Sequence, residues 1–464
     1  MESQTNESLF EIVDELETQV FLEKLISVTA QYNWLLNAFM VDFFVDELYL
    51  RIPRCWQHLY MTVRVEDIIF LLSSSTHTSS TRVWPLSLLA LRSFISTHSL
   101  RRHPLVSVDN VCPLPAGRSS KGLSINHLEH VSPKKMHQIR ILGSLVGRFF
   151  ECSNMLVGGT VVDAGSGKGH LSRLLRDVYG LKVIAVDCND AIVSRSRVID
   201  LKRVNKKLST DPPIVHLVQR LTKQGWLDSL SKSEPLALIG LHACGHLSEH
   251  LIREFVVSDR CKLLLSVGCC YMHLATEHQT WKPLSRRLQS LKSTASFGYA
   301  ALDCACHSNE RFISKLTDAN KPSSLVVHSY RAALEWLLVR RLCFSRRNRL
   351  YPVREARLLS FAEYAEKATR NLNLNLNYSE LENDLTVRWM LKQWPQVAFF
   401  YALRSLLAPL VESIILLDRA LFLRENGSEV LLAPLFDPLV CARNLLLVGF
   451  KASPTACVPW KRPH

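Results

Sequence analysis

The sequence lacks the N-terminal signals of secreted and organellar proteins. Residues 1–50 contain no basic segment followed by an apolar run, and they are acid-rich rather than arginine-rich. The 13 cysteines are odd in number and follow no repeating spacing, so the sequence does not indicate a disulfide framework. We therefore expect reduced thiols and a cytoplasmic or nuclear location.

The sequence also lacks an uninterrupted apolar run of membrane-spanning length. Its longest apolar stretch, residues 397–417, contains Arg404, Pro409 and Glu412. The stretch is long enough to register as a span, but one charged residue at mid-span costs roughly 2.5–3.5 kcal/mol on insertion scales. We interpret it as buried core helix.

Acidic residues are scarce outside the N-terminus. Residues 1–50 carry ten acids and one base, whereas the other 414 residues carry 32 acids and 55 bases, a net charge of +23. A basic body of this kind attracts polyanions such as RNA. The same charges also promote solubility, so charge alone does not choose between these roles.

The chain has 464 residues, which is more than the roughly 250–300 residues that usually pack around a single hydrophobic core. We therefore expect two or three packed units. Apolar residues at spacings of three and four predict helices near the N-terminus, and a proline- and glycine-containing segment predicts a linker. The predicted organisation is a helical region at 1–105, a linker at 106–130, an α/β core at 131–310, a helical insertion at 311–425, and a hairpin with tail at 426–464.

Short apolar segments that alternate with helices follow residue 160. This pattern is typical of a parallel sheet covered on both faces. Two further apolar segments flank a turn, which predicts an antiparallel hairpin. A doubly wound sheet closed by such a hairpin is the Rossmann-like arrangement of class I methyltransferases. The predicted strands are residues 160–163, 183–187, 214–218, 236–241, 263–267, 430–436 and 445–451.

A glycine-rich loop follows the first of these strands and precedes a helix, the context in which such loops bind nucleotide-like ligands. It is not a P-loop, because Val162 occupies the first glycine position and Gly169 follows the lysine. It is not a dinucleotide fingerprint either, because His170 replaces the required glycine. The pattern favours S-adenosylmethionine, with an acidic residue at the end of the second strand to bind the ribose hydroxyls. The predicted cofactor residues are Asp163, Gly165, Gly167, Gly169 and Asp187.

Histidine and cysteine follow the fourth and fifth strands, where catalytic groups of this architecture lie. The candidates are His242, Cys244, Cys269 and Cys270. The Asn/Asp-Pro-Pro-Tyr/Phe motif that clamps adenine in N6-methylases is missing after the fourth strand.

Three interpretations of these residues remain open. They form a wall of the substrate site with His242 as acid or base, or Cys244, Cys269 or Cys270 is the nucleophile of a cytosine C5-methylase. In the third, zinc binds to ligands drawn from Cys269, Cys270, His273, Cys304, Cys306 and His307. The spacing of this last set is a weak signal, and we predict no metal.

Basic residues suggest where a substrate would bind. The candidates are Lys134 and Lys135, at the start of the helix before the first strand, and Arg346, Arg347 and Arg349 in the insertion. Tyr351 offers a stacking face beside the arginines. A solvated helix face or a localisation signal explains the arginines equally well. If they bind RNA, the acidic N-terminal segment is expected to cover them.

Several motifs together resemble the methyltransferase-like protein 25 family, also called ribosomal RNA adenine dimethylase domain-containing. They are the glycine loop, the run from Ser132 to Ile139, Leu241-His-Ala-Cys-Gly-His-Leu-Ser248, Val267-Gly-Cys-Cys-Tyr271, and the C-terminal segments around Glu412, Arg419 and Arg443. The resemblance implies a class I S-adenosylmethionine-dependent methyltransferase. The domain is more distantly similar to tRNA 2′-O-methyltransferases that carry zinc modules, although Tyr271 departs from the histidine of that type and residues 1–130 lack the modules.

These observations predict an S-adenosylmethionine-dependent methyltransferase acting on RNA. A protein methyltransferase and a catalytically inactive scaffold that retains the fold remain the alternatives.

Overall fold

The computed structural model describes residues 11–12, 15–73, 82–103, 131–205, 212–222, 224–230, 233–276, 278–291, 296–317, 325–372, 374 and 377–451. The chain divides into two compact units. The first contains residues 1–28, 100–306 and 412–464, and the second contains residues 29–99 and 307–411. The segment predicted as a linker, 106–130, lies outside the described residues.

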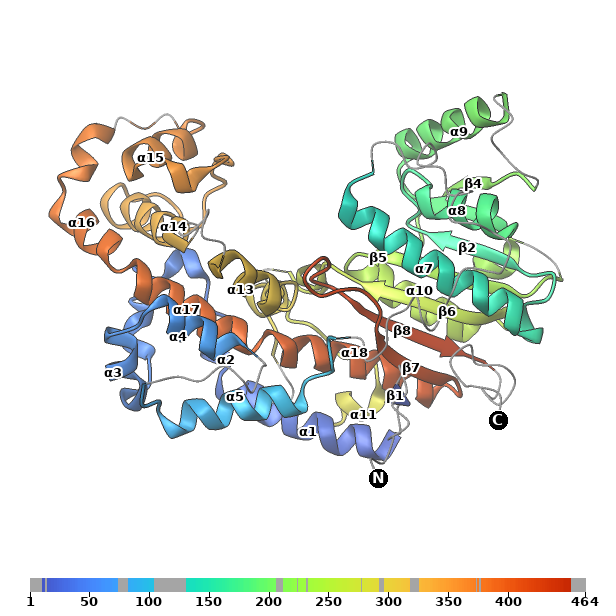
Figure 1. Ribbon diagram of the computed structural model, residues 1–464, viewed down its shortest axis with the longest axis horizontal. Coiled ribbons are helices and arrows are strands. Elements are labelled where there is room, and N and C mark those ends of the chain that lie inside the picture. Colours follow the sequence, from blue (N-terminus) through green and yellow to red (C-terminus); the bar gives the residue numbers. More distant parts are fainter. Residues whose placement is uncertain are drawn as a thin grey trace. The chain divides into compact units, whose positions relative to one another are not determined.

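The first unit is built on one sheet of eight strands (Figure 1). Its spatial order is β1-β7-β8-β6-β5-β2-β3-β4. The strands are β1 (Glu11–Ile12), β2 (Thr160–Ala164), β3 (Lys182–Asp187), β4 (Val215–Val218), β5 (Leu236–Ala243), β6 (Cys261–Gly268), β7 (Glu429–Pro434) and β8 (Leu445–Phe450).

The strand directions confirm the predicted fold class. Strands β4, β3, β2, β5 and β6 run parallel, and β8 pairs antiparallel with both β6 and β7. The sheet is therefore doubly wound and closed by the hairpin of residues 429–450. Strand β1, which pairs antiparallel with β7, was not predicted, because residues 1–105 were expected to be helical throughout.

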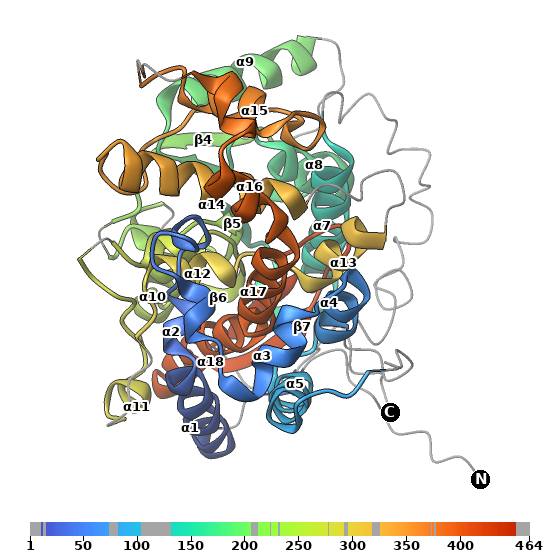
Figure 2. The same cartoon turned by 90° about the vertical axis from the view of Figure 1, so that its left-hand side faces the viewer.

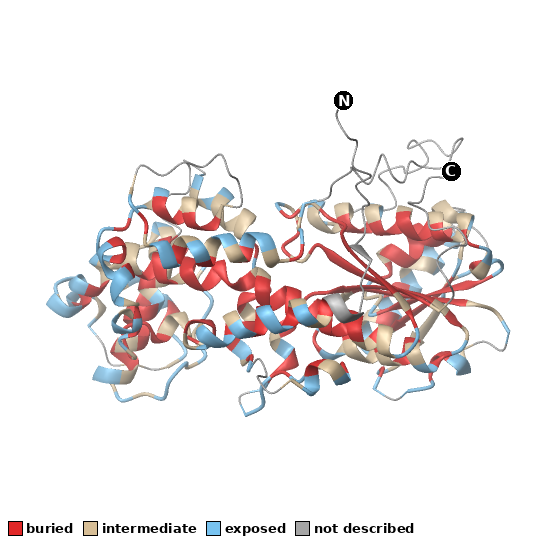
Figure 3. Cartoon of the chain, turned by 90° about the horizontal axis from the view of Figure 1, so that it is seen from below, coloured by how far each residue is buried: buried red, intermediate tan, exposed pale blue. Residues whose placement is uncertain are grey.

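Helices cover both faces of this sheet. On one face, α7 (Pro133–Cys152) and α8 (His170–Tyr179) pack on a continuous apolar cluster that includes Val161, Ile239 and Val448. On the other face, α10 (His246–Val257) and α18 (Ala408–Glu425) reach the sheet at Gly449, where Phe255 and Leu423 leave little space. Burial on both faces explains why the strands are apolar without alternation (Figure 3).

Local signals explain why α7 begins where it does and how closely it packs. Ser132 caps the helix by accepting a hydrogen bond from the Lys135 backbone N–H, and Pro133 occupies the first helical position. Side chains at Gly143 and Gly147 would collide with α8, so these glycines set the close approach of the two helices. The remaining helices of this unit are α1 (Glu15–Gln31), which continues into the second unit, α9 (Asp190–Asn205), α11 (Arg286–Gln289) and α12 (Tyr299–Cys304).

The second unit is helical and is arranged around α17 (Trp394–Leu406), which is labelled in Figure 2. Most residues of α17 are buried. Helices from both of its chain segments contact α17. They are α2 (Asn33–Leu36), α3 (Arg54–Met61), α4 (Val65–Leu72), α14 (Val326–Trp336) and α16 (Leu385–Lys392). The unit also contains α5 (Leu86–His98), α13 (Asn309–Thr317) and α15 (Phe361–Thr369).

The apolar stretch of residues 397–417 forms parts of two helices rather than one. Helix α17 ends at Leu406 and α18 begins at Ala408, with Pro409 in the first turn of α18, where proline is tolerated. Both segments are buried, as predicted for core helix. None of the helices in the described residues combines the length and apolarity needed to cross a bilayer.

Candidate cofactor and catalytic site

The glycine loop joins the end of β2 to the start of α8. Gly165, Gly167 and Gly169 have φ values of +74°, +54° and +71°, a left-handed conformation that residues with a Cβ rarely adopt. A Cβ on Gly167 would meet no atom within 4 Å, so this side of the loop is open to a ligand. A Cβ on Gly169 would lie 2.7 Å from Ser196 Oγ, so this glycine serves the packing of the loop against α9.

Asp187 ends β3 beside this loop. Its two carboxylate oxygens each accept a backbone N–H: Oδ2 from Gly167 and Oδ1 from Asn189, both at 2.9 Å. Each oxygen can accept two hydrogen bonds, so both keep capacity for a further donor. The carboxylate therefore fixes the loop and still offers acceptors to a pair of ribose hydroxyls.

Asp163 is buried at the end of β2 and has a different role. Ser172 Oγ, in the first turn of α8, donates a hydrogen bond to Asp163 Oδ2 at 2.6 Å. Burial raises the pKa of Asp163 to about 6, and the positive charge of Lys135 opposes that rise. Asp163 thus connects the strand to the helix behind the loop, and Ser172 is a partner that sequence reasoning missed.

These residues fit S-adenosylmethionine. The open face at Gly167 leaves room for the nucleoside, and the unused lone pairs of Asp187 suit the ribose hydroxyls. The bound cofactor would supply an activated methyl group at the carboxyl ends of the strands, where β2 and β5 are neighbours in the sheet.

Three cysteine thiols meet at the ends of β5 and β6. Cys244 Sγ lies 2.8 Å from Cys269 Sγ, and Cys269 Sγ lies 3.6 Å from Cys270 Sγ. Cys269 is buried, Cys270 is half-buried and Cys244 is exposed. Strands β5 and β6 are parallel neighbours, so their carboxyl ends meet and bring together residues 25 apart in the sequence.

The close approach of the thiols separates their pKa values. Hydrogen bonds from the Cys269 and Cys270 thiols lower the pKa of Cys244 to about 6. The same hydrogen bond, together with burial, raises the pKa of Cys269, and burial raises that of Cys270. Within the cluster, the exposed Cys244 is therefore the thiol that loses its proton most readily.

His242 lies just before this cluster with a φ of +65°, which is unusual for a residue other than glycine. Its Nε2 is 3.0 Å from Gln138 Oε1 on α7, so Nε2–H donates and Nδ1 keeps its lone pair. Burial lowers the pKa of His242 to about 4, and Lys134 contributes to the decrease. Gln138 was not predicted, although it lies within the Ser132–Ile139 run that supports the family resemblance.

The family motifs near the C-terminus pack against the end of β6. Tyr271 is buried in a short helical turn, η7 (Tyr271–Leu274), and its hydroxyl lies 3.3 Å from Glu412 Oε1 on α18. Glu412 also forms a buried ion pair with Arg102. The Arg443 guanidinium donates to the Cys306 carbonyl oxygen. These residues pack around the segment that follows β6.

The cysteines of the alternative zinc set do not gather as that hypothesis requires. In the described part of the chain, the group whose potential ligand atoms lie within 4.8 Å of one another is Cys244, Cys269 and Cys270. It contains none of Cys304, Cys306 and His307. The Cys306 thiol instead donates to the Cys269 carbonyl oxygen at 3.2 Å, a structural contact.

The predicted substrate residues belong to both compact units. Lys134 and Lys135 lie in the first, and their charges influence the pKa values of His242 and Asp163, which places both lysines beside the candidate site. The arginines lie in the second unit.

Two of the predicted arginines are ion-paired. Arg346 Nη1 lies 2.8 Å from Asp46 Oδ1, and Arg347 Nε lies 3.1 Å from Asp42 Oδ2. The Arg347 guanidinium also lies over the Phe39 ring, 3.8 Å from its centroid. Two acids that precede residue 50 therefore pair with two arginines of the basic segment, and the covering of an RNA-binding surface by the acidic segment stays a prediction.

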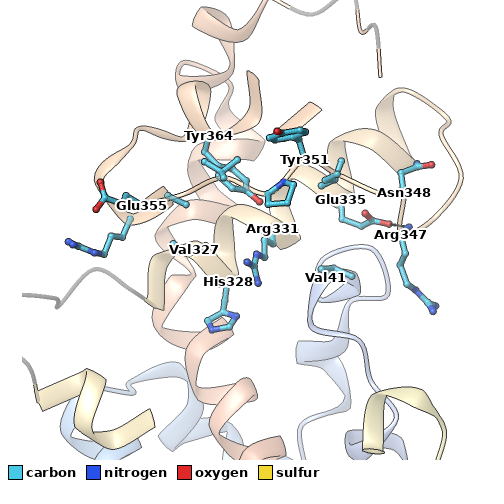
Figure 4. Close-up of a pocket in the computed structure, with 15 residues that line it drawn as sticks. Val41, Val327, His328, Arg331, Glu335, Arg347, Asn348, Tyr351, Glu355 and Tyr364 are labelled. Carbon is cyan, nitrogen blue, oxygen red and sulfur yellow. Dashed lines mark hydrogen bonds between the residues drawn. The ribbon is translucent and has the colours of Figure 1, made fainter. Parts of the chain in front are cut away.

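A cavity of about 550 Å³ opens beside Arg347 in the second unit (Figure 4). Three arginines, Arg331, Arg347 and Arg357, contribute positive charge to its lining, and Glu335 and Glu355 contribute negative charge. Tyr351 and Tyr364 contribute aromatic rings. One face of Tyr351 is already covered, because the Arg370 guanidinium lies 3.0 Å from the ring centroid. Sequence reasoning missed Arg331 and Tyr364, which α14 and α15 bring to the cavity.

Comparison with known proteins agrees with this description. A family model described as "Methyltransferase domain" matches residues 134–277. The chain contains a methyltransferase domain. The predicted domain type and its S-adenosylmethionine cofactor are thereby confirmed.

The curated relatives agree with the stated resemblance. The chain is 26% identical over 239 residues to "Probable methyltransferase-like protein 25" of Homo sapiens and 25% identical over 240 residues to that of Mus musculus. Each alignment covers 48% of this chain, but only 38% of the human and 39% of the mouse protein. The chain thus matches about two fifths of the length of these relatives, and the resemblance to their family is confirmed for that part.

Two solved methyltransferases align with the chain at low similarity. The 23S rRNA methyltransferase ErmE is 17% identical, with a TM-score of 0.20, over 30% of this chain and 51% of ErmE. Coclaurine N-methyltransferase, solved with N-methylheliamine and SAH, is 10% identical, with a TM-score of 0.22, over 85% of this chain and 96% of that enzyme. The fold assignment rests instead on the strand order and the domain match.

Proposed function

We propose that this protein transfers a methyl group from S-adenosylmethionine to RNA. The proposal rests on one observation. The glycine loop, Asp187 and the segments after β5 and β6 all lie at the carboxyl ends of the parallel strands of one sheet. The loop and Asp187 hold the cofactor, while His242 and the three thiols line the neighbouring strand ends.

His242 has the protonation state needed to orient a substrate hydroxyl. A pKa of about 4 keeps the imidazole neutral near pH 7, and its hydrogen bond to Gln138 fixes Nδ1 as the acceptor. A base this weak accepts a hydrogen bond more readily than a proton. We therefore assign to His242 the role of positioning the group that accepts the methyl.

Charge supports RNA as the substrate. Residues 51–464 carry a net charge of +23, and Lys134 and Lys135 lie beside His242 and Asp163. The cavity of the second unit adds guanidinium groups and aromatic rings, which suit phosphates and bases respectively. We assign Arg346, Arg347 and Arg349 to the approach of the RNA backbone.

Transfer of tritiated methyl groups to fractionated lysate tests the proposal. The lysate comes from cells that lack the protein, so that its acceptor sites are unmethylated. We expect label in the RNA fraction with the full chain, and little label when Lys134 and Lys135 are both replaced by alanine. Label confined to the protein fraction would instead establish a protein methyltransferase. Cofactor binding without label in either fraction would establish an inactive scaffold.

A further inference from the structure

The cluster of Cys244, Cys269 and Cys270 has the composition of a metal site. All three sulfur atoms lie within 4.8 Å of one another. Free buried cysteines usually act as small apolar side chains and have apolar neighbours. Here each thiol has another thiol as its neighbour, and the exposed sulfur of Cys244 opens the cluster to solvent.

The spacing is close to what a soft divalent cation requires. Four sulfur ligands at a Zn–S distance of about 2.3 Å in a tetrahedron lie roughly 3.8 Å apart. The Cys269–Cys270 separation of 3.6 Å matches this spacing. The Cys244–Cys269 separation of 2.8 Å is shorter, and rotation of the exposed Cys244 side chain would lengthen it.

The backbone around the cluster is well fixed. Gly245 has a φ of +51°, and a Cβ there would lie 2.6 Å from the Cβ of His273. The charge of His273 also influences the Cys244 thiol, so the imidazole lies near the open side of the cluster. The two strand ends therefore hold three sulfurs, and His273 of the turn η7 packs closely beside Gly245 next to them.

We propose that Cys244, Cys269 and Cys270 bind a thiophilic divalent cation such as Zn²⁺ through three thiolates. The fourth position is open to water, to His273 or to the methyl acceptor, as in zinc sites that perform chemistry. Binding displaces the thiol protons, which pass to solvent. The proposal does not depend on RNA as the substrate, because the three ligands all come from the strand ends.

Titration with Co²⁺ tests this site directly. The full chain is purified under reducing conditions, stripped with a chelator and titrated while thiolate-to-cobalt charge-transfer absorption is recorded. We expect one equivalent of Co²⁺ to produce the band and Zn²⁺ to displace it. Cys244→Ser is the decisive variant, because this side chain is exposed and its replacement leaves the core intact.

Matched controls separate the cluster from other thiols. Cys343→Ser removes an exposed thiol of the second unit and Cys152→Ser removes a half-buried one of the first, and both variants are expected to keep the band. The Cys269→Ser and Cys270→Ser variants should lose it, as Cys244→Ser does. A missing band in the fully reduced chain would overturn the proposal, and so would a band of equal strength in Cys244→Ser. Methyl transfer is not measured, so failure here leaves the proposed function untouched.

Discussion

The carboxylate of Asp187 accepts the backbone N–H of Gly167 at 2.9 Å, which joins the end of β3 to the glycine loop after β2. Both residues were predicted to bind the cofactor, and they are 20 positions apart in the sequence. Their hydrogen bond means that Asp187 shapes the loop, in addition to the ribose-binding role that we predict for it.

Replacing Asp187 with alanine should weaken cofactor binding. The variant loses both the ribose acceptors and the hydrogen bond to the loop. Hydrogen bonds to charged groups contribute about 1.5–3 kcal/mol, so affinity for S-adenosylhomocysteine should fall roughly 10- to 150-fold. Isothermal titration calorimetry measures this change. Asp190→Ala, three residues later at an exposed position, is the control and should bind normally.

A side chain at position 167 should block the cofactor without unfolding the protein. Gly167→Ala places a methyl group in the open space that we assign to the ligand and strains a left-handed backbone, at about 1–2 kcal/mol. Gly158 has a similar φ of +68° and equally open surroundings, but it lies before β2. Gly158→Ala should therefore lose similar stability in thermal unfolding and keep its affinity for S-adenosylhomocysteine. Equal affinity in the two variants would refute the placement of the cofactor.

The sequence allowed the fold to be predicted because its signals are local. Apolar strands, the glycine loop and the final hairpin each depend on neighbouring residues, and all seven predicted strands are present. Contacts between distant segments carry no such signal. Gln138 reaches His242 across 104 positions, and Asp42 reaches Arg347 across 305, so neither pair could be identified from the sequence.

The thiol cluster shows the same limit at the site itself. We selected Cys244, Cys269 and Cys270 as candidate site residues because each follows a predicted strand. It is the parallel pairing of β5 and β6 that brings their thiols together. The zinc alternative combined Cys269 and Cys270 with Cys304 and Cys306 but left out Cys244, and the weak spacing signal led us to predict no metal. In the structure, the Cys306 thiol donates a hydrogen bond to the backbone carbonyl of Cys269.

His242 should make stability depend on pH in a defined direction. Its folded pKa of about 4 is below that of an unfolded imidazole, so the unfolded chain binds more protons between about pH 4 and 6.5. Stability therefore rises with pH across this window. Asparagine tolerates a positive φ, so His242→Asn keeps the backbone and removes the titration. Chemical denaturation should show a wild-type minus variant difference that increases by about 1–3 kcal/mol from pH 4 to 6.5. A constant difference would exclude the lowered pKa.

The ion pair between Arg346 and Asp46 should control RNA binding if the acidic segment covers the basic one. Asp46→Asn releases Arg346, so affinity for RNA should rise and depend more steeply on salt. Arg346→Ala should do the opposite and reduce the salt slope by about one. The pair is partly exposed, and its loss should change stability by only about 0–1 kcal/mol. Fluorescence anisotropy with labelled RNA at several salt concentrations measures both effects. Affinity that is unchanged in both variants would remove this arginine from the substrate path and refute the covering role of Asp46.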